Sequence, residues 1–251
     1  MSKLIINSDD FGYGRGINHG IIDTHQEGIL TSASLMTNTP GFHHAVKLAK
    51  ANPTLGVGIH LVLTHLKPLR TDVPSLVDEN GNFYRPDAYR SGLAVADLDE
   101  LYKEWDTQIQ TAIDAGIQPT HLDSHHHAHA LNEYHQTVIL KLAQKYDLPI
   151  RGNLETEQAY KTTSYFEPAF ATISVLDHYE IEHYLGNLIE RIKENESTEI
   201  MCQVGYVDEH LHRNSSFSNP RVQQVEILMN SPFADQIRND KDIELITYAE
   251  L

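Results

Sequence analysis

Short apolar runs alternate with longer segments of helical periodicity along the whole chain. The apolar runs predict seven β-strands: Lys3–Ser8, Ser32–Met36, Gly56–Val62, Pro119–Asp123, Pro149–Arg151, Glu199–Val207 and Ile243–Tyr248. Between them, apolar residues recur three and four positions apart, which predicts helices around Ile17–Ile22, Ala45–Ala49, Leu98–Ile113, Tyr134–Leu142, Ile181–Ile192 and Val222–Leu228. This alternation is typical of βα units around a parallel sheet, so we predict an α/β fold, as an open sheet or a barrel.

One segment, Lys67–Gly92, interrupts this alternation. It contains three prolines, and its Asn80-Gly81 pair lies between two short apolar stretches, which predicts a small β-hairpin excursion. Long loops in compact domains often have a function, so Tyr84 and Tyr89 are candidates to cover a ligand. Packing against the chain itself or against a second copy is the alternative. No repeat or linker divides the chain, and we expect a single domain over residues 1–251.

The composition narrows the classes of partner. The chain of 251 residues has 19 Lys and Arg against 35 Asp and Glu, a formal charge of −16. This charge repels phosphate backbones and anionic lipids, so we expect no nucleic-acid or membrane partner. The first apolar run, Leu4–Ile6, is too short for a signal sequence, which favours a cytoplasmic protein. The single cysteine, Cys202, lies in an apolar run and is interpreted as a buried thiol.

Two predicted strands end in or contain groups that can bind metal or move protons. Asp9 and Asp10 follow the first strand directly, and His60 lies within the third. Ligand sites of α/β folds collect at the carboxyl ends of parallel strands, so the two carboxylates are candidates for a metal ligand and a general base. A turn or helix cap is the alternative for the carboxylates, and a core histidine is the alternative for His60.

A third strand end carries a dense histidine tract. Of the 16 histidines in the chain, five lie in Thr120–His129, together with Asp123. This tract interrupts a packed βα pattern, which favours a metal or catalytic role over a surface histidine cluster. Two imidazoles and a carboxylate from separate strands would leave open coordination positions for water and substrate. Spacing alone does not separate His125 from His126 or His127 as the ligand.

Four motifs together resemble one known family. They are NSDDFG at Asn7–Gly12, GIHLVLT at Gly58–Thr64, THLDSHHHAH at Thr120–His129 and GYVD at Gly205–Asp208. Their order and spacing resemble the YdjC-like carbohydrate deacetylases, whose activity includes deacetylation of chitooligosaccharides. The resemblance implies a (β/α) barrel-like fold related to the TIM barrel, with about seven parallel strands. It also implies a homodimer that acts on a small acetylated sugar or oligosaccharide.

The resemblance also assigns roles to individual residues. Asp10, His60 and His125 would hold a divalent ion, usually magnesium, and Asp9 would be the general base. Arg151, at the end of a predicted strand, could orient Asp9 or a substrate group, and a surface ion pair is the alternative. Two imidazoles suit zinc or another transition metal better than magnesium, so both kinds of ion are candidates.

The chain departs from the family at one motif. Relatives carry His-Pro-Gly-Tyr, whose imidazole is the expected general acid, and this chain has Gln203-Val204-Gly205-Tyr206. Glutamine has no titratable proton near neutrality. The acid would then be His126, His127 or His210, or the leaving amine would be protonated through water. His126, His127 and Tyr206 are also candidates to bind or orient the substrate.

These residues favour a metal-dependent hydrolase that removes acetyl groups from N-acetylated carbohydrates. Backbone N–H groups near Phe11 or Gly12 are candidates to stabilise the oxyanion. Because of Gln203, a sugar-binding or regulatory protein with weakened catalysis is the second hypothesis. Glycoside hydrolysis ranks last, since it needs two separated carboxylates and the sequence offers only the adjacent Asp9 and Asp10, with Asp123.

Overall fold

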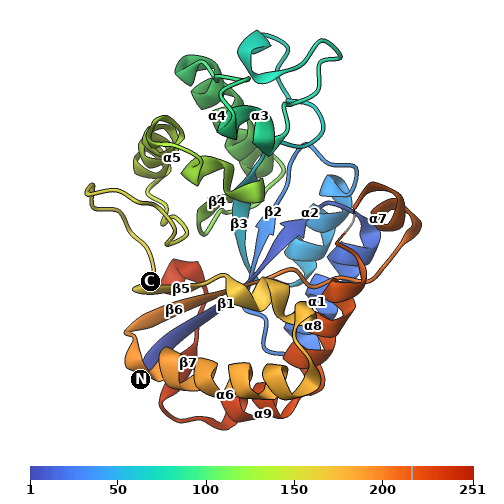
Figure 1. The fold of residues 1–251 in the computed structure, drawn as a ribbon, viewed down its shortest axis with the longest axis vertical. Coiled ribbons are helices and arrows are strands. Elements are labelled where there is room, and N and C mark those ends of the chain that lie inside the picture. Colours follow the sequence, from blue (N-terminus) through green and yellow to red (C-terminus); the bar gives the residue numbers. More distant parts are fainter. Residues whose placement is uncertain (216) are drawn as a thin grey trace.

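One curled parallel sheet organises the molecule. The computed structural model describes residues 1–215 and 217–251. The strands of the sheet follow the order β4-β3-β2-β1-β6-β5, and β7 pairs with the first residues of β1. The strands are β1 (Ser2–Phe11), β2 (Ser32–Leu35), β3 (Gly56–Leu61), β4 (Leu122–Ser124), β5 (Tyr165–Glu167), β6 (Ser197–Cys202) and β7 (Ile243–Leu245). The sheet forms a half-barrel with helices around it, which confirms the predicted α/β barrel-like class (Figure 1).

Helices connect the strands and cover the outside of the sheet. They are α1 (Arg15–Glu27), α2 (Phe42–Ala51), α3 (Pro86–Arg90), α4 (Leu98–Asp114), α5 (Glu133–Tyr146), α6 (His178–Glu194), α7 (Glu209–Asn214), α8 (Asn219–Asn230) and α9 (Pro232–Asn239). Short 3₁₀ helices are η1 (Pro74–Leu76), η2 (His125–Ala130), η3 (Ala169–Val175) and η4 (Tyr248–Glu250). The helical segments predicted from periodicity all fall within α1, α2, α4, α5, α6 and α8. Periodicity therefore located the long helices and missed the short ones.

The strand predictions differ from the structure at several points. Pro149–Arg151 makes one parallel bridge, between Ile150 and Leu122, and is not a full strand. The sixth predicted strand stops at Cys202, because the next amides bond to side chains in place of a neighbouring strand: Gln203 N–H donates to Gln224 and Val204 N–H donates to Ser8. The last strand stops at Leu245. The sequence analysis missed β5, which is short and half-exposed.

The excursion over residues 67–92 is mostly irregular. Its Asn80-Gly81 turn is present, with Gly81 at φ +73°, but the predicted hairpin is reduced to a single antiparallel bridge between Val77 and Phe83. Tyr84 and Tyr89 pack edge to face, 6.2 Å between ring centres, and Tyr89 also contacts His135. These tyrosines pack against their own chain, which was the alternative interpretation.

The two sides of β1 have different chemistry. Leu4 and Ile6 belong to the main apolar core, whereas Ile5 packs with Ile246 and Tyr248 on the other side. Further along that inner side, Asn7 donates a hydrogen bond to Ser34 on β2 (2.9 Å). Side chains alternate along a strand, so the inner side continues to Asp9. The inside of the half-barrel therefore changes from apolar to polar toward the carboxyl end of β1.

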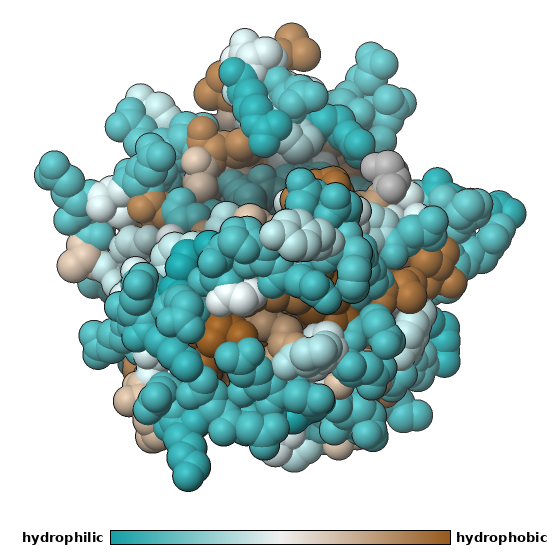
Figure 2. All heavy atoms as spheres, turned by 60° about the horizontal axis from the view of Figure 1, so that its bottom comes forward, coloured by the Kyte–Doolittle hydropathy of each residue, from teal (hydrophilic) through white to brown (hydrophobic). Residues whose placement is uncertain are grey.

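The outer surface agrees with the charge of the chain. On the face drawn in Figure 2, hydrophilic side chains cover most of the surface, and hydrophobic side chains show in separate patches near the centre, on the right and toward the top. Among the described residues, no helix combines the length and apolar character that crossing a bilayer requires.

Candidate active site

The predicted strand ends meet in one pocket. The cavity has a volume of about 430 Å³ and lies at the carboxyl ends of β1, β3, β4 and β6. Of the residues singled out in the sequence, it is lined by Asp9, Asp10, His60, His125, His126, His127 and Gln203. Ligand sites of parallel α/β sheets form at this end, so the fold brings together groups that are far apart in the sequence.

A backbone irregularity lets adjacent aspartates share the pocket. Asp10 has φ +68°, in the left-handed region, and the pairing of β1 with β2 shifts register between Ser8 and Phe11. Neighbouring side chains of a regular strand point to opposite faces, but this kink turns Asp10 toward the same cavity as Asp9. Left-handed backbone at a non-glycine residue costs about 1–3 kcal/mol and is typical of functional sites.

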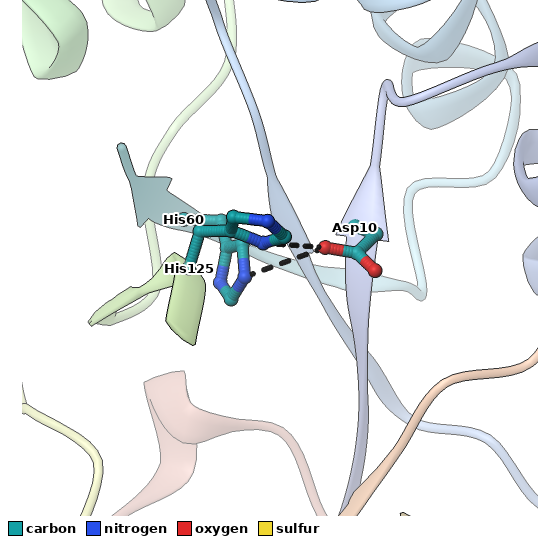
Figure 3. A group of neighbouring side chains, drawn as sticks. All are labelled: Asp10, His60 and His125. Carbon is teal, nitrogen blue, oxygen red and sulfur yellow. Dashed lines mark ion pairs between the residues drawn. The ribbon is translucent and has the colours of Figure 1, made fainter. Parts of the chain in front are cut away.

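Asp10, His60 and His125 form a compact set of metal-ligand types. The Asp10 carboxylate Oδ1 lies 3.0 Å from His125 Nδ1 and 3.6 Å from His60 Nε2. The dashed lines in Figure 3 mark these two contacts. These three ligand atoms lie within 4.8 Å of one another, and all three residues are buried. In the described part of the chain, the buried Asp10 Oδ1 accepts no hydrogen bond of acceptable geometry, although His125 Nδ1 lies 3.0 Å away. An orphaned carboxylate oxygen facing two imidazoles fits a divalent cation.

A second carboxylate fixes the orientation of His60. His60 Nδ1 lies 2.9 Å from Asp123 Oδ1, and an ionised carboxylate only accepts, so Nδ1–H donates. Nε2 then faces Asp10, and a bound cation would take the place of the proton on this nitrogen. Burial lowers the pKa of His60, but Asp123 and Asp9 outweigh it and raise this pKa to about 9.

Arg221, on α8, holds the other oxygen of Asp10. Its Nη2 lies 2.6 Å from Asp10 Oδ2, and both side chains are buried. Burial would raise the pKa of Asp10, but Arg221, His125 and His60 hold this pKa well below its usual range. Asp10 is therefore ionised, with Oδ1 left for the cation.

Arg151 is fully buried beneath the pocket and binds three carboxylates. It lies 2.7 Å from Asp9 Oδ1, 2.9 Å from Asp123 Oδ2 and 2.9 Å from Glu199 Oε1. The surface ion pair considered for Arg151 is thus wrong. Burial lowers the pKa of Arg151, but the three carboxylates raise it well above its usual range. Asp9, His60 and Asp123 also lie close enough to hold an ion, but the guanidinium already supplies the positive charge there.

The histidine tract folds into a strained turn. His126 and His127, in η2, have φ values of 55° and 52°, so two successive residues are left-handed. His126 Nδ1 lies 2.9 Å from Thr64 Oγ1, and His127 Nδ1 lies 3.0 Å from Asn153 Nδ2. Burial lowers the pKa of His126 to about 3 and of His127 to about 4. The turn presents both rings, in neutral form, to the cavity that His125 also lines.

Several sequence-based candidates lie elsewhere. The Tyr206 hydroxyl donates to Asp23 (2.9 Å), and Tyr206 and His210 are outside the lining of the pocket. The Gly12 N–H donates to Asn18 (2.7 Å) and is therefore already engaged in this structure. Cys202 is buried, as predicted, and burial raises the pKa of its thiol.

Part of the pocket lining was not predictable from the sequence. Tyr13, His65 and Arg85 line the cavity, and Tyr13 stacks on His65 with 5.4 Å between ring centres. Arg85 comes from the irregular excursion and His65 from the loop after β3, where no spacing rule links them to the strand ends. Arg221 lies within helix α8, and only its contact with Asp10 in three dimensions reveals its role.

Two buried histidines predict acid sensitivity. His121 and His129 are fully buried, and burial lowers the pKa of each to about 3. The unfolded state has histidine pKa values near 6.5, so below that pH it binds protons that the folded state does not. Stability present above pH 6.5 is therefore lost as the pH falls toward 3. His121 and His129 together should lower the free energy of unfolding by about 2.7 kcal/mol per pH unit between about pH 5.5 and 4. The other buried histidines with lowered pKa values, His126 and His127 among them, should make the total slope steeper.

Urea unfolding at pH 5.5 and 4.5 measures this slope, and a His121→Gln variant is its control. The slope of the free energy of unfolding against pH should be smaller in the variant by about 1.4 kcal/mol per pH unit, because one buried imidazole is gone. His60 does not interfere, since its raised pKa affects stability only as the pH rises from about 6.5 to 9. Equal stability at the two pH values would contradict the prediction.

Comparison with known proteins gives a consistent result. The model of the family described as YdjC-like protein matches residues 3–239. Proteins named carbohydrate deacetylase from Clostridium beijerinckii and Brevibacillus brevis are 39% and 40% identical, and the alignments cover 99% of this chain and 100% and 99% of theirs. A crystal structure from Enterococcus faecalis, described as a candidate cellobiose-phosphate cleavage protein, has a TM-score of 0.89 at 34% identity. That alignment covers 99% of this chain and 98% of the other.

Proposed function

Since this chain belongs to the YdjC-like protein family, we propose that it is a metal-dependent hydrolase that removes acetyl groups from N-acetylated carbohydrates, with small chitooligosaccharides as substrates. The full-length similarity to carbohydrate deacetylases supports a hydrolase of this class. The observation that carries the metal dependence is the orphaned Asp10 Oδ1 between the nitrogens of His60 and His125.

In this proposal Asp10, His60 and His125 hold the divalent ion. A divalent ion bound there would polarise the acetyl carbonyl and lower the pKa of water. Magnesium is the ion that the family resemblance implies, while two imidazoles suit zinc, cobalt or nickel. Arg221 keeps Asp10 Oδ2 engaged, so that one carboxylate oxygen is available to the ion.

Asp9 is the proposed general base. It lines the cavity, and Arg151 holds its carboxylate through two hydrogen bonds of 2.7 and 3.2 Å. Asp9 accepts a proton from water as the water oxygen attacks the acetyl carbon. The carbon–nitrogen bond then breaks, the nitrogen takes up a proton, and acetate and an amino sugar leave.

Gln203 motivates the second candidate, a sugar-binding homologue with weakened catalysis. Gln203 lines the pocket, where it can donate a hydrogen bond but cannot supply a proton near neutrality. Robust turnover by the unmodified protein would exclude this alternative, whereas a Gln203→His variant that gains activity over a silent parent would support it. The homodimer and the cytoplasmic location remain predictions, and sedimentation analysis would test the first.

The test is acetate release from diacetylchitobiose and longer chitooligosaccharides by metal-stripped protein, reloaded separately with magnesium, zinc, cobalt and nickel. We expect turnover with at least one of these ions and none after chelation, because a bound ion would be the Lewis acid that polarises the acetyl carbonyl. Tight metal binding without acetate release from any of the sugars would contradict the proposed reaction. The same disaccharide without acetyl groups serves as the blank, because it has no acetate to release.

A further inference from the structure

A series of buried hydrogen bonds connects side chains at the wall of the pocket with His129 in the interior. His127 Nδ1 lies 3.0 Å from Asn153 Nδ2, and Asn153 Oδ1 lies 2.6 Å from His129 Nε2. His129 Nδ1 contacts the hydroxyl of Ser124, which also accepts the backbone N–H of His129 at 2.9 Å. His129 is fully buried, whereas His127 and Ser124, at the two ends of this series, line the cavity, Ser124 with only 1% of its surface exposed.

The direction of each bond follows from the last group in the series. Ser124 Oγ already accepts one N–H, and within residues 1–215 and 217–251 its hydroxyl has no other acceptor than His129 Nδ1. The hydroxyl therefore donates to Nδ1, which leaves the proton of His129 on Nε2, where it donates to Asn153 Oδ1. The amide of Asn153 must then donate to His127 Nδ1. This assignment places the single proton of a neutral His127 on Nε2.

We propose that His127 donates a hydrogen bond to the acetyl oxygen of the substrate, and that Asn153, His129 and Ser124 fix the tautomer that makes it a donor. This inference rests on the proposed function. In the described part of the chain, His127 Nε2 has no hydrogen-bond partner. Its left-handed backbone, with φ 52°, is the kind of strain that a positioned catalytic group sustains. His127 touches the substrate in this account and is a catalytic residue, while Asn153 is a positioning residue.

The fixed donor suits hydrolysis of an acetyl group. Negative charge develops on the acetyl oxygen as water attacks, and a donor already oriented toward it needs no reorganisation. Gln203 lines the same cavity on the β6 side, and it can donate a hydrogen bond but carries no titratable proton. His127 would be a further hydrogen-bond donor in this cavity. No proton leaves His127 in this role, so its effect is on the stability of the transition state.

The first experiment reads the tautomer directly in metal-loaded, substrate-free protein. Long-range nitrogen–proton correlation NMR distinguishes Nε2–H from Nδ1–H imidazoles, and the His127 signals are identified by their disappearance in His127→Gln. We expect the Nε2–H form in the unmodified protein and a mixture of both forms in Asn153→Ala. An Nδ1–H form in the unmodified protein would overturn the proposal, whether or not the protein releases acetate.

The second experiment is kinetic. We expect His127→Leu to lower kcat about 100- to 1,000-fold with KM changed little, and His127→Gln, which keeps an N–H donor, to retain more activity. Metal content should stay at the wild-type level in both. The exposed His178→Leu is the matched control and should behave as wild type. Turnover of His127→Leu within about threefold of wild type would overturn the donor role. If no sugar is deacetylated by the parent, the proposed function fails and the NMR result still decides the tautomer.

Discussion

Asp9→Asn should lower kcat for acetate release by about 100- to 10,000-fold while the protein still binds its metal. The amide keeps the shape of the carboxylate and can still accept a hydrogen bond from Arg151, but it cannot take a proton from water. Asp9 is also outside the Asp10, His60 and His125 set, so the metal content should stay unchanged. Steady-state kinetics and metal analysis on the same sample measure both effects.

Glu199→Gln is the matched control for Asp9→Asn. Glu199 is a buried carboxylate on the same guanidinium, 2.9 Å from Arg151 Nη2, but it does not line the pocket. Its substitution should leave kcat within a few-fold of wild type. Full activity of Asp9→Asn, or an equal loss in the two variants, would mean that the carboxylates around Arg151 act through structure and that Asp9 is not the base.

Arg151→Met should destabilise the fold more than a change at any exposed charge. The substitution leaves the buried carboxylates of Asp9, Asp123 and Glu199 without their shared cation. Breaking a buried ion pair by removing one partner costs about 3–5 kcal/mol, because the remaining charge stays in a medium of low polarity. For a chain of this length that corresponds to a decrease in Tm of about 6–20 °C. Thermal unfolding followed by circular dichroism measures it.

Two variants make the interpretation of Arg151→Met specific. Arg90→Met removes an exposed ion pair with Asp87 and should change stability by less than about 0.5 kcal/mol. Adding Glu199→Gln to Arg151→Met should recover part of the loss, since one uncompensated charge is gone. A Tm of Arg151→Met equal to that of wild type would contradict the account of a charge-balanced interior.

Periodicity predicted most of the fold, and it failed where pairing depends on distant residues. The α/β class and the long helices follow from local patterns that each segment carries in itself. The Pro149–Arg151 stretch looks like a strand locally, but only Ile150 pairs with a neighbour. Conversely, β5 carries no clear alternation, and pairing with β6 makes it a strand. Such tertiary effects are absent from the local sequence.

The candidate site was predictable to the extent that its groups follow strands. Asp10, His60 and His125 converge as the strand-end rule predicts, although the choice of His125 came from the family resemblance. The contacts that tune these groups were not predictable in the same way. Arg221 reaches Asp10 from a helix that begins more than two hundred residues later, and the left-handed turn at His126 and His127 has no glycine to signal it.

Acetate release by this protein should require an ion held by Asp10, His60 and His125. The most direct measurement is a titration of metal-stripped protein in which bound metal and acetate release are followed side by side, with Asp10→Ala in parallel. The account predicts that both signals rise together, level off at about one ion per chain, and are absent in Asp10→Ala. Acetate release that persists in the chelated protein, or an Asp10→Ala variant that binds metal and turns over as wild type does, would contradict it.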